Sequence, residues 1–350
     1  MKIINSCPFN LEDGKTRILW EITPRCNMKC KHCLFFNNNC KDLKKELTTE
    51  EVFKIIDNVC KDTSVKAIWI SGGEPLLRND IVEICKYIKS KNIKPSLSSN
   101  GILLNKQLIN DLYNAGVEYI HLSLDGSNAA THNKLRGVDN AFEELMRVLD
   151  LLKDSKIHKG ASFMVTEESI SEIEDILNIA KEKQLDVMSF YLVAELGRGA
   201  KNFKNDKTIL SQKLADKMNS IDQTKYKNTK IEVFRTDMHN CEDEKVLQEC
   251  KGYNFLNITY DGNLGACPWL MKSEFGFEVG SLLEEDFVSL KEKCVEKMKS
   301  VIQSRKQNIE YCKSCKNEKY CGKGCVALQV NINNNYNGVD PICPRISNTK

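Results

Sequence analysis

Six short apolar runs alternate with six longer amphipathic stretches over the first two thirds of the chain. The runs are rich in β-branched and aromatic residues, as strands are, and they are RILWEI (17–22), AIWIS (67–71), KPSLSS (94–99), YIHLSL (119–124), GASFMV (160–165) and VMSFYLV (187–193). Helical periodicity marks the stretches 49–60, 80–91, 106–114, 141–153, 171–183 and 209–223. Repeated β-then-α units predict parallel strands joined by right-handed crossovers.

Six such units are fewer than the eight that close a complete barrel. We therefore predict an α/β fold in which an N-terminal extension, 1–16, precedes a partial (β/α)6 TIM-like barrel over 17–225. An active site is expected at the carboxyl ends of its strands. A doubly wound parallel sheet is the alternative arrangement for the same pattern.

The pattern changes after residue 225. NFLNITYDGNLGAC (254–267) contains two short strand-like runs around an Asp-Gly turn, which predicts a β-hairpin. Half of the 16 cysteines lie between positions 250 and 343. This composition predicts a small, irregular, metal-dense domain over 226–350.

Charge and hydropathy exclude several classes of function. The chain has 51 basic and 48 acidic side chains, so it lacks the basic excess of a nucleic-acid or membrane-surface protein. No apolar segment reaches the roughly 18 residues of a membrane span, and the N-terminus has no apolar core of a secretion signal. We expect a cytoplasmic protein, in which disulfides are rare and clustered cysteines indicate metal.

The first cysteine cluster directly follows the first predicted strand. Cys26, Cys30 and Cys33 stand in the pattern C-x-x-x-C-x-x-C. Three thiolates on one loop can hold three irons of a [4Fe–4S] cluster, leaving the fourth iron open to a substrate. A zinc site with His32 as the fourth ligand is the alternative, but His32 lies in the short turn between two of the cysteines, which is cramped for one tetrahedral centre.

This spacing resembles the signature of the radical S-adenosylmethionine (AdoMet) enzymes. The resemblance implies an adenine contact from the backbone of His32. Gly72-Gly73-Glu74, after the second predicted strand, resembles the motif that binds the methionine amino group. Physical chemistry agrees, because adjacent glycines permit close backbone approach and a carboxylate accepts hydrogen bonds from an ammonium.

The resemblance continues along the later strand ends. It implies contacts with the ribose and carboxylate of AdoMet from residues at the ends of the third and fourth strands, namely Ser98, Ser99, Asn100, Ser123 and Asp125. Arg136 matches an arginine that pairs with the AdoMet carboxylate, and Leu192 matches a backbone contact to adenine.

The stretch CKSCKNEKYCGKGC (312–325) would alone resemble a zinc ribbon. Together with three further cysteines it resembles the seven-cysteine motif of the SPASM extension of radical AdoMet enzymes. That resemblance implies two auxiliary [4Fe–4S] clusters, three clusters in all. The outer cluster would be held by Cys312, Cys315, Cys321 and Cys343. The inner cluster would be held by Cys250, Cys267 and Cys325, with Cys241 placed to complete it.

The combined resemblance implies an oxidoreductase that forms a 5′-deoxyadenosyl radical. We expect it to modify a peptide or protein, by a thioether or a side-chain cross-link in a ribosomally made peptide. It would need a low-potential electron donor such as flavodoxin or ferredoxin. Because only about sixteen residues precede the first strand, a separate leader-binding protein is a further expected partner.

Three alternatives remain open. One is formylglycine formation of the anaerobic sulfatase-maturating type, although Pro268 follows Cys267 where those relatives have an aspartate. Another is oxidation of a small molecule or a tetrapyrrole side chain. The third, from a different class, is a non-catalytic electron-transfer or zinc-binding module. The sequence nominates no catalytic base.

Overall fold

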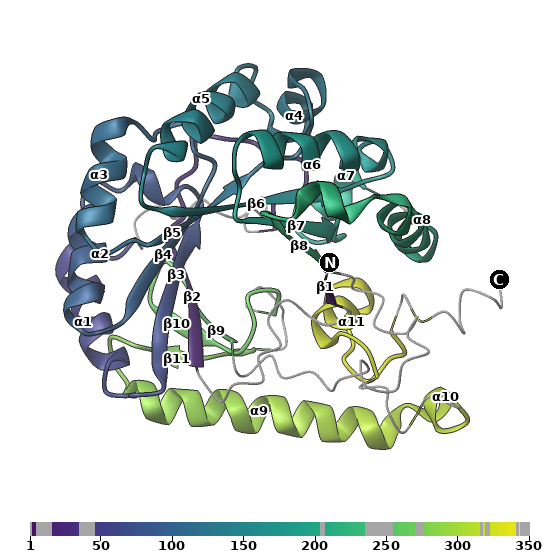
Figure 1. The fold of residues 1–350 in the computed structure, drawn as a ribbon. Coiled ribbons are helices and arrows are strands. Elements are labelled where there is room, and N and C mark those ends of the chain that lie inside the picture. The colour runs from purple at the N-terminus through teal and green to yellow at the C-terminus, as the bar shows by residue number, and fades with distance from the viewer. Residues whose placement is uncertain are drawn as a thin grey trace.

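The computed structural model describes residues 2–4, 16–34, 46–203, 207–234, 255–270, 276–315, 318, 323–340 and 343. Three of the predicted cluster ligands, Cys241, Cys250 and Cys321, lie outside these described residues. Figure 1 shows a curved sheet with helices along its outer side and a long helix below its last strands.

All strands of the described chain belong to one sheet, in the order β1-β8-β7-β6-β5-β4-β3-β2-β9-β10-β11. The six predicted strands are confirmed as β2 (Thr16–Thr23), β3 (Val65–Gly72), β4 (Lys94–Ser99), β5 (Tyr119–Ser123), β6 (His158–Val165) and β7 (Val187–Leu192). Each pairs in parallel with the next along the chain. The α/β fold with a partial parallel barrel is therefore confirmed.

Two strands at one edge of the sheet were not predicted, and neither was β11 (Glu278–Ser281) at the other edge. β8 (Lys230–Phe234) extends the parallel sheet beyond β7, and β1 (Lys2–Ile4) pairs in parallel with β8 at the edge. The parallel sheet thus continues past position 225, and the division into domains at that position stays a prediction.

The predicted helices cover the outer side of the sheet. They are α1 (Thr49–Val59), α2 (Ile81–Ser90), α3 (Lys106–Asn114), α5 (Ala141–Lys153), α6 (Ile173–Glu182) and α8 (Lys207–Ser220). Two shorter helices, α4 (Ala129–Arg136) and α7 (Gly199–Asn202), follow β5 and β7. Both lie where a strand of the barrel gives way to a loop, so they border the edge at which an active site is expected.

Local chemistry explains where α1 begins. The Thr48 side chain accepts a hydrogen bond from the Glu51 amide (3.2 Å), and the Glu51 carboxylate accepts one from the Thr48 amide (2.8 Å). This reciprocal cap satisfies two amides that the first helical turn leaves without partners. The apolar side chains of α1, such as Val52 and Ile55, then pack fully buried against the sheet.

Strand residues alternate between two environments. In β3, Ile68 and Ile70 are fully buried against the helices, whereas Trp69 and Ser71 are half-buried on the other side of the sheet. This period of two follows from the pleat of a strand. It gives the barrel an inner face that differs in chemistry from its apolar outer face.

The C-terminal part adds strands and helices to the barrel. The predicted hairpin is confirmed as β9 (Phe255–Ile258) and β10 (Asn263–Gly265), which pair antiparallel and continue to β11 (Glu278–Ser281). β9 also pairs in parallel with β2. The helices α9 (Phe287–Asn308), α10 (Glu310–Lys313) and α11 (Val326–Asn333) follow. This part is therefore less irregular than its composition predicts.

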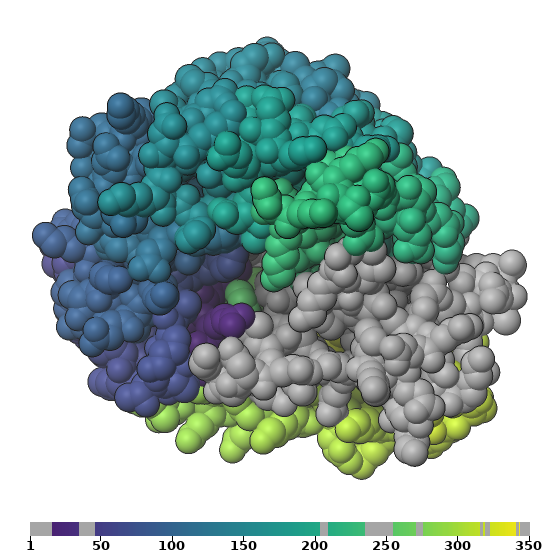
Figure 2. All heavy atoms as spheres, in the orientation of Figure 1, coloured from purple at the N-terminus to yellow at the C-terminus, as the bar shows by residue number. Residues whose placement is uncertain are grey.

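Figure 2 shows the molecule in the same orientation, with a hollow between the blue and green atoms of the barrel and purple atoms from its first segment visible inside. No helix formed by the described residues is long and apolar enough to cross a membrane.

Candidate functional site

The predicted cofactor residues lie at one edge of the sheet. The cysteine loop (26–33) follows β2, Gly72-Gly73-Glu74 spans the end of β3, and Asn100 follows β4 directly. Asp125 comes two residues after β5, and Leu192 ends β7. Because these strands are parallel, their carboxyl ends meet at the same edge. The structure therefore brings together residues that are separated by up to 166 positions.

The three cysteines of the loop lie in or beside a small group of apolar side chains. Cys30 is buried there with Met28 and Ala141, and Cys26 and Cys33 are half-buried at its margin. Burial raises the pKa of the Cys26 thiol to about 11 and also raises that of Cys30. Thiolates in this setting need a strong positive partner, which the irons of a cubane cluster would supply. The loop therefore fits an iron–sulfur cluster.

A single zinc ion at this loop, with His32 as the fourth ligand, is the alternative that the sequence leaves open. In the part of the chain that the structure describes, no group of three His, Cys, Asp or Glu side chains is arranged to hold one ion. The buried His32 ring faces the Asp125 carboxylate, with 3.4 Å between Nε2 and Oδ2. A cubane takes one thiolate per iron, so its cysteines stand farther apart than those around a single ion.

Helix α4 and the segment that follows β7 hold the cysteine loop in place. The Lys31 amide donates to the Leu135 carbonyl of α4 (2.8 Å). After β7, the Arg198 amide donates to the Cys33 carbonyl (3.0 Å), and the Asn202 side chain donates to the Lys31 carbonyl (2.8 Å). The sequence reading missed this support. Its only sequence signal is the glycine pair of LGRG (196–199), where a Cβ on Gly197 would lie 2.5 Å from the Cys33 carbonyl oxygen.

The glycines before Glu74 also contact the cysteine loop. A Cβ on Gly73 would lie 2.0 Å from the Arg25 carbonyl oxygen, and the Glu74 amide donates to that same oxygen (2.7 Å). Gly72 adopts a φ of 116°, which favours glycine. In this structure, therefore, the two glycines permit a close approach of backbone to backbone.

Glu74 is buried and its carboxylate is fixed by three donors. Oε1 accepts from the Ser99 hydroxyl (2.8 Å) and the Leu76 amide (3.1 Å), and Oε2 accepts from the Asn100 amide (2.8 Å). Burial raises the pKa of Glu74, and these hydrogen bonds oppose that rise. The residue of β4 that touches Glu74 is thus Ser99. Ser98 lies on the inner face instead, where its Oγ accepts from the Trp69 indole (2.6 Å).

Asp125 joins several buried groups beyond β5. Its Oδ1 accepts from the Met164 amide (2.8 Å), and its own amide donates to His132 Nδ1 (3.1 Å). Its Oδ2 pairs with Arg136 Nη2 at 2.5 Å. Burial alone would raise the pKa of Asp125, but Arg136 and the neighbouring His32 and His132 hold it below its ordinary value.

Arg136 is buried between two groups of this chain. Besides Asp125, its guanidinium contacts the Cys30 sulfur, with 3.5 Å between Nη1 and Sγ. Two other residues expected to contact AdoMet lie nearby: Ser123 is half-buried at the end of β5, and Leu192 is buried at the end of β7. The contacts of these residues with AdoMet stay predictions.

The described cysteines of the C-terminal part fall into two environments. Cys267 and Cys294 are buried in the hydrophobic core that the barrel shares, and Cys325 packs against the same core. Cys312, Cys315 and Cys343 are half-buried outside it. None of the described cysteines forms a disulfide.

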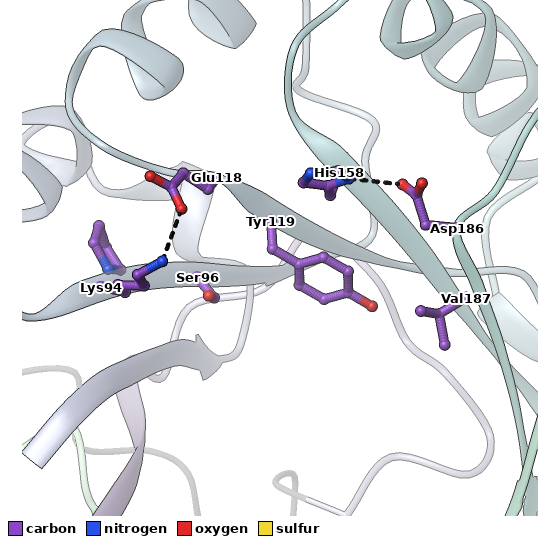
Figure 3. A pocket seen from close by; sticks show the side chains of 8 residues that line it. Lys94, Ser96, Glu118, Tyr119, His158, Asp186 and Val187 are labelled. Atoms are coloured by element: carbon purple, nitrogen blue, oxygen red, sulfur yellow. Dashed lines mark hydrogen bonds and ion pairs between the residues drawn. The ribbon is translucent and has the colours of Figure 1, made fainter. Parts of the chain in front are cut away.

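A separate hollow opens at the opposite end of the barrel. It has a volume of about 370 Å³ and is lined by Lys94, Pro95, Ser96, Glu118, Tyr119, His158, Asp186 and Val187. Figure 3 shows the ion pairs Lys94–Glu118 (3.2 Å) and His158–Asp186 (3.5 Å) at its rim. These residues lie at the starts of strands, so this hollow is distinct from the cofactor edge.

Solved structures share the fold. SuiB of Streptococcus suis bound to the precursor peptide SuiA superposes with a TM-score of 0.76 at 18% identity, covering 96% of this chain and 77% of SuiB. The enzyme anSMEcpe with bound AdoMet superposes with a TM-score of 0.72 at 18% identity, covering 95% of this chain and 94% of that one. At this level of identity the similarity concerns the fold.

Sequence relatives extend over different shares of the chain. The AdoMet-dependent heme synthase of Nitratidesulfovibrio vulgaris is 26% identical over 96% of this chain and 95% of its own length. The Fe-coproporphyrin III synthase of Methanosarcina barkeri is 32% identical over 56% of this chain, but the match spans only 48% of that relative. A probable GTP 3′,8-cyclase of Methanococcus maripaludis is 30% identical over 70% of this chain and 82% of its own length.

The family assignment agrees with the geometry. The model of the radical SAM superfamily matches residues 20–180, which contain the cysteine loop, Glu74, Asp125 and Arg136. Membership implies a [4Fe–4S] cluster and AdoMet as cofactors. From this match and from the cyclase relative at 30% identity, we conclude that the chain is an enzyme of the radical SAM superfamily.

Proposed function

We propose that this enzyme is of the SPASM type and oxidatively modifies a side chain of a peptide, forming a thioether or a side-chain cross-link. Cys26, Cys30 and Cys33 would hold the [4Fe–4S] cluster, which when bound would supply the electron for cleavage of AdoMet and so the radical chemistry that removes a hydrogen atom from the substrate. The residues of this chain would bind AdoMet, orient the substrate and exclude water.

Glu74 is suited to bind the AdoMet ammonium. Its carboxylate is held in one position by Ser99, Leu76 and Asn100, so no side-chain entropy is lost when a ligand binds. A carboxylate oxygen has more than one acceptor site, which leaves room for an ammonium donor. A charge-assisted hydrogen bond in a buried site contributes about 1.5–3 kcal/mol.

The inner face of the barrel would surround the substrate. The rings of Trp69, Tyr119 and His121 meet edge to face, with centroids 5.7 Å (Trp69–Tyr119) and 5.8 Å (Trp69–His121) apart. Across the barrel, Tyr191 and Phe234 stack with centroids 4.7 Å apart. Such a lining keeps water away from a reactive radical.

The charge of the inner face is the observation on which we base the proposal of a peptide substrate. Among the inner-face positions whose side chains the structure describes, Arg17, Lys94 and Lys230 are cationic, and all three lie at strand starts, away from the cofactor edge. Lys230 also pairs with the inner-face carboxylate of Glu232 (2.5 Å). A substrate with several carboxylates would lack paired cations here, and an unpaired buried charge is costly. An uncharged or apolar peptide side chain suits this lining better.

Tetrapyrrole modification is the second candidate. It is favoured by the heme synthase of N. vulgaris, which aligns with 96% of this chain. The two candidates separate in one assay. The reconstituted enzyme is incubated anaerobically with AdoMet and reductant, either with a cysteine-containing peptide encoded beside its gene or with Fe-coproporphyrin III. Mass spectrometry then shows which compound is altered.

The test of radical chemistry needs no substrate. We expect the reconstituted protein, with AdoMet and dithionite under anaerobic conditions, to form 5′-deoxyadenosine, which liquid chromatography detects. The matched control omits the reductant. If a protein with its full iron and sulfide content forms no 5′-deoxyadenosine, the proposal fails.

We also propose two auxiliary clusters with the ligand sets expected from the sequence, in which Cys325 and Cys312 belong to different clusters. The shared core position of Cys267 and Cys325 supports this division. Replacing Cys325 with alanine is expected to remove the inner cluster and about a third of the iron, because each cubane takes its own cysteine ligands. EPR spectra of the reduced variants Cys325→Ala and Cys312→Ala should therefore lack different signals. Loss of the same signal in both would contradict the division.

A further inference from the structure

We propose that Arg136 raises the reduction potential of the cluster held by Cys26, Cys30 and Cys33, and that Asp125 opposes this effect by lowering it. This inference rests on the proposed function, because it requires a cluster on that loop. The resemblance to known enzymes implies a different role, namely binding of the AdoMet carboxylate. The contacts of Arg136 within this chain point to the cluster instead.

The guanidinium of Arg136 lies between a cysteine and a carboxylate. Nη1 is 3.5 Å from the Cys30 sulfur, and Nη2 is 2.5 Å from Asp125 Oδ2. The Arg136 residue is 7% exposed, so solvent screens these interactions weakly. A buried hydrogen bond from a cation to a ligating sulfur acts directly on the charge of the cluster.

The backbone holds Arg136 against the cysteine loop as well. The Arg136 carbonyl accepts from the Lys29 amide (3.2 Å). Arg136 ends α4, and the next residue, Gly137, has a φ of 70°. A Cβ on Gly137 would lie 2.9 Å from the Lys29 carbonyl oxygen, so only glycine lets the helix end approach this closely.

Asp125 is anchored independently of Arg136. The Met164 amide donates to its Oδ1 (2.8 Å), which fixes the carboxylate from β6. The charged side chains that the structure places beside Cys30 are therefore Arg136, which contacts its sulfur, and Asp125, which pairs with Arg136.

The sign of each effect follows from these charges. Reduction adds one negative charge to the cluster. A nearby cation stabilises the reduced form and raises the reduction potential, whereas a nearby anion lowers it. Removing the charge of Arg136 should therefore lower the potential, and removing the charge of Asp125 should raise it. Two neighbouring substitutions are expected to act in opposite directions.

The alternative role makes a different prediction. Nε of Arg136 has no hydrogen-bond partner among the described residues, so it could also reach a bound carboxylate. If binding AdoMet were the function of Arg136, its replacement would weaken AdoMet binding but leave the potential measured without AdoMet unchanged. The potential of the AdoMet-free enzyme therefore separates the two roles.

The experiment is an EPR-monitored redox titration of the reconstituted full-length protein without AdoMet. At a fixed potential, Arg136→Gln should decrease the ratio of reduced to oxidised cluster about tenfold, which corresponds to about 59 mV for a one-electron couple. Asp125→Asn should increase that ratio. Arg136→Lys, which keeps the charge, should restore most of the wild-type value. Arg147→Gln removes an exposed arginine on α5 that pairs with Glu144 and serves as the matched control.

Two results would overturn the proposal: an unchanged potential in Arg136→Gln, or a shift in the same direction in Arg136→Gln and Asp125→Asn. If Arg136→Gln does not load iron, Asp125→Asn and Arg136→Lys still decide the sign. A failure of the proposed function would look different, because the wild-type protein would then lack any signal that depends on Cys30.

Discussion

Replacing Cys30 with alanine is expected to abolish 5′-deoxyadenosine formation while leaving most of the iron in the protein. Cys30 is the most buried cysteine of its loop, and its sulfur accepts a hydrogen bond from the guanidinium of Arg136. Even residues that only orient cluster ligands change activity by about 10–100-fold, so loss of a ligand should cost more than that. The measurements are the rate of 5′-deoxyadenosine formation and the iron content per chain.

Cys85→Ala provides the matched control for this prediction. Cys85 is fully buried on α2, away from the cofactor edge, and burial raises the pKa of its thiol to about 12. We expect this substitution to lower the stability by about 1 kcal/mol without affecting the rate. A Cys30→Ala protein that still forms 5′-deoxyadenosine at the wild-type rate would refute the assignment of the loop.

Replacing Glu74 with alanine is expected to weaken AdoMet binding by at least about tenfold, which corresponds to about 1.4 kcal/mol, and to destabilise the fold. The Ser99 hydroxyl and the Leu76 and Asn100 amides would lose their acceptor. Each buried donor left without a partner costs about 1–3 kcal/mol. Isothermal titration calorimetry with AdoMet and thermal unfolding measure the two effects.

Ser99→Ala separates the two contributions of Glu74. It removes one of the three donors to the carboxylate but keeps the negative charge. We expect a smaller decrease in melting temperature and nearly normal AdoMet affinity. If Glu74→Ala lowers the melting temperature yet binds AdoMet as the wild type does, Glu74 has a structural role alone.

Much of the barrel could be predicted because its pattern is local. α3 and α5 begin and end at the predicted residues, since their apolar faces repeat every three or four positions. The cysteine loop and Glu74 were found from short motifs next to strand ends. Such features depend on neighbours in the sequence, so the sequence alone contains them.

Other features depend on residues that are far apart in the sequence. The edge strand β1 has three residues, too few to show a period of its own. The pairing of Arg136 with Asp125 and Cys30 depends on how α4 docks against the cysteine loop, which motif spacing does not encode. α9 did carry a signal: Phe287, Leu290, Cys294, Met298 and Val301 are buried at helical spacing. This spacing was not used to predict a helix, because the cysteines on either side of α9 indicated an irregular, metal-binding domain.

The pairing of β9 with β2 has a consequence for the order in which the enzyme matures. β2, which leads into the cysteine loop, lies between β3 and β9, and the buried Asn257 amide donates to Glu21 (3.0 Å). A ribosome adds about 5–20 residues per second, so β9 emerges more than ten seconds after β2. Until then β2, the strand that leads into the cysteine loop, lacks its neighbouring strand on one side. We therefore expect iron to be loaded after translation. In a nascent chain stalled before β9, the edge of β2 that pairs with β9 should lack its hydrogen-bond partner.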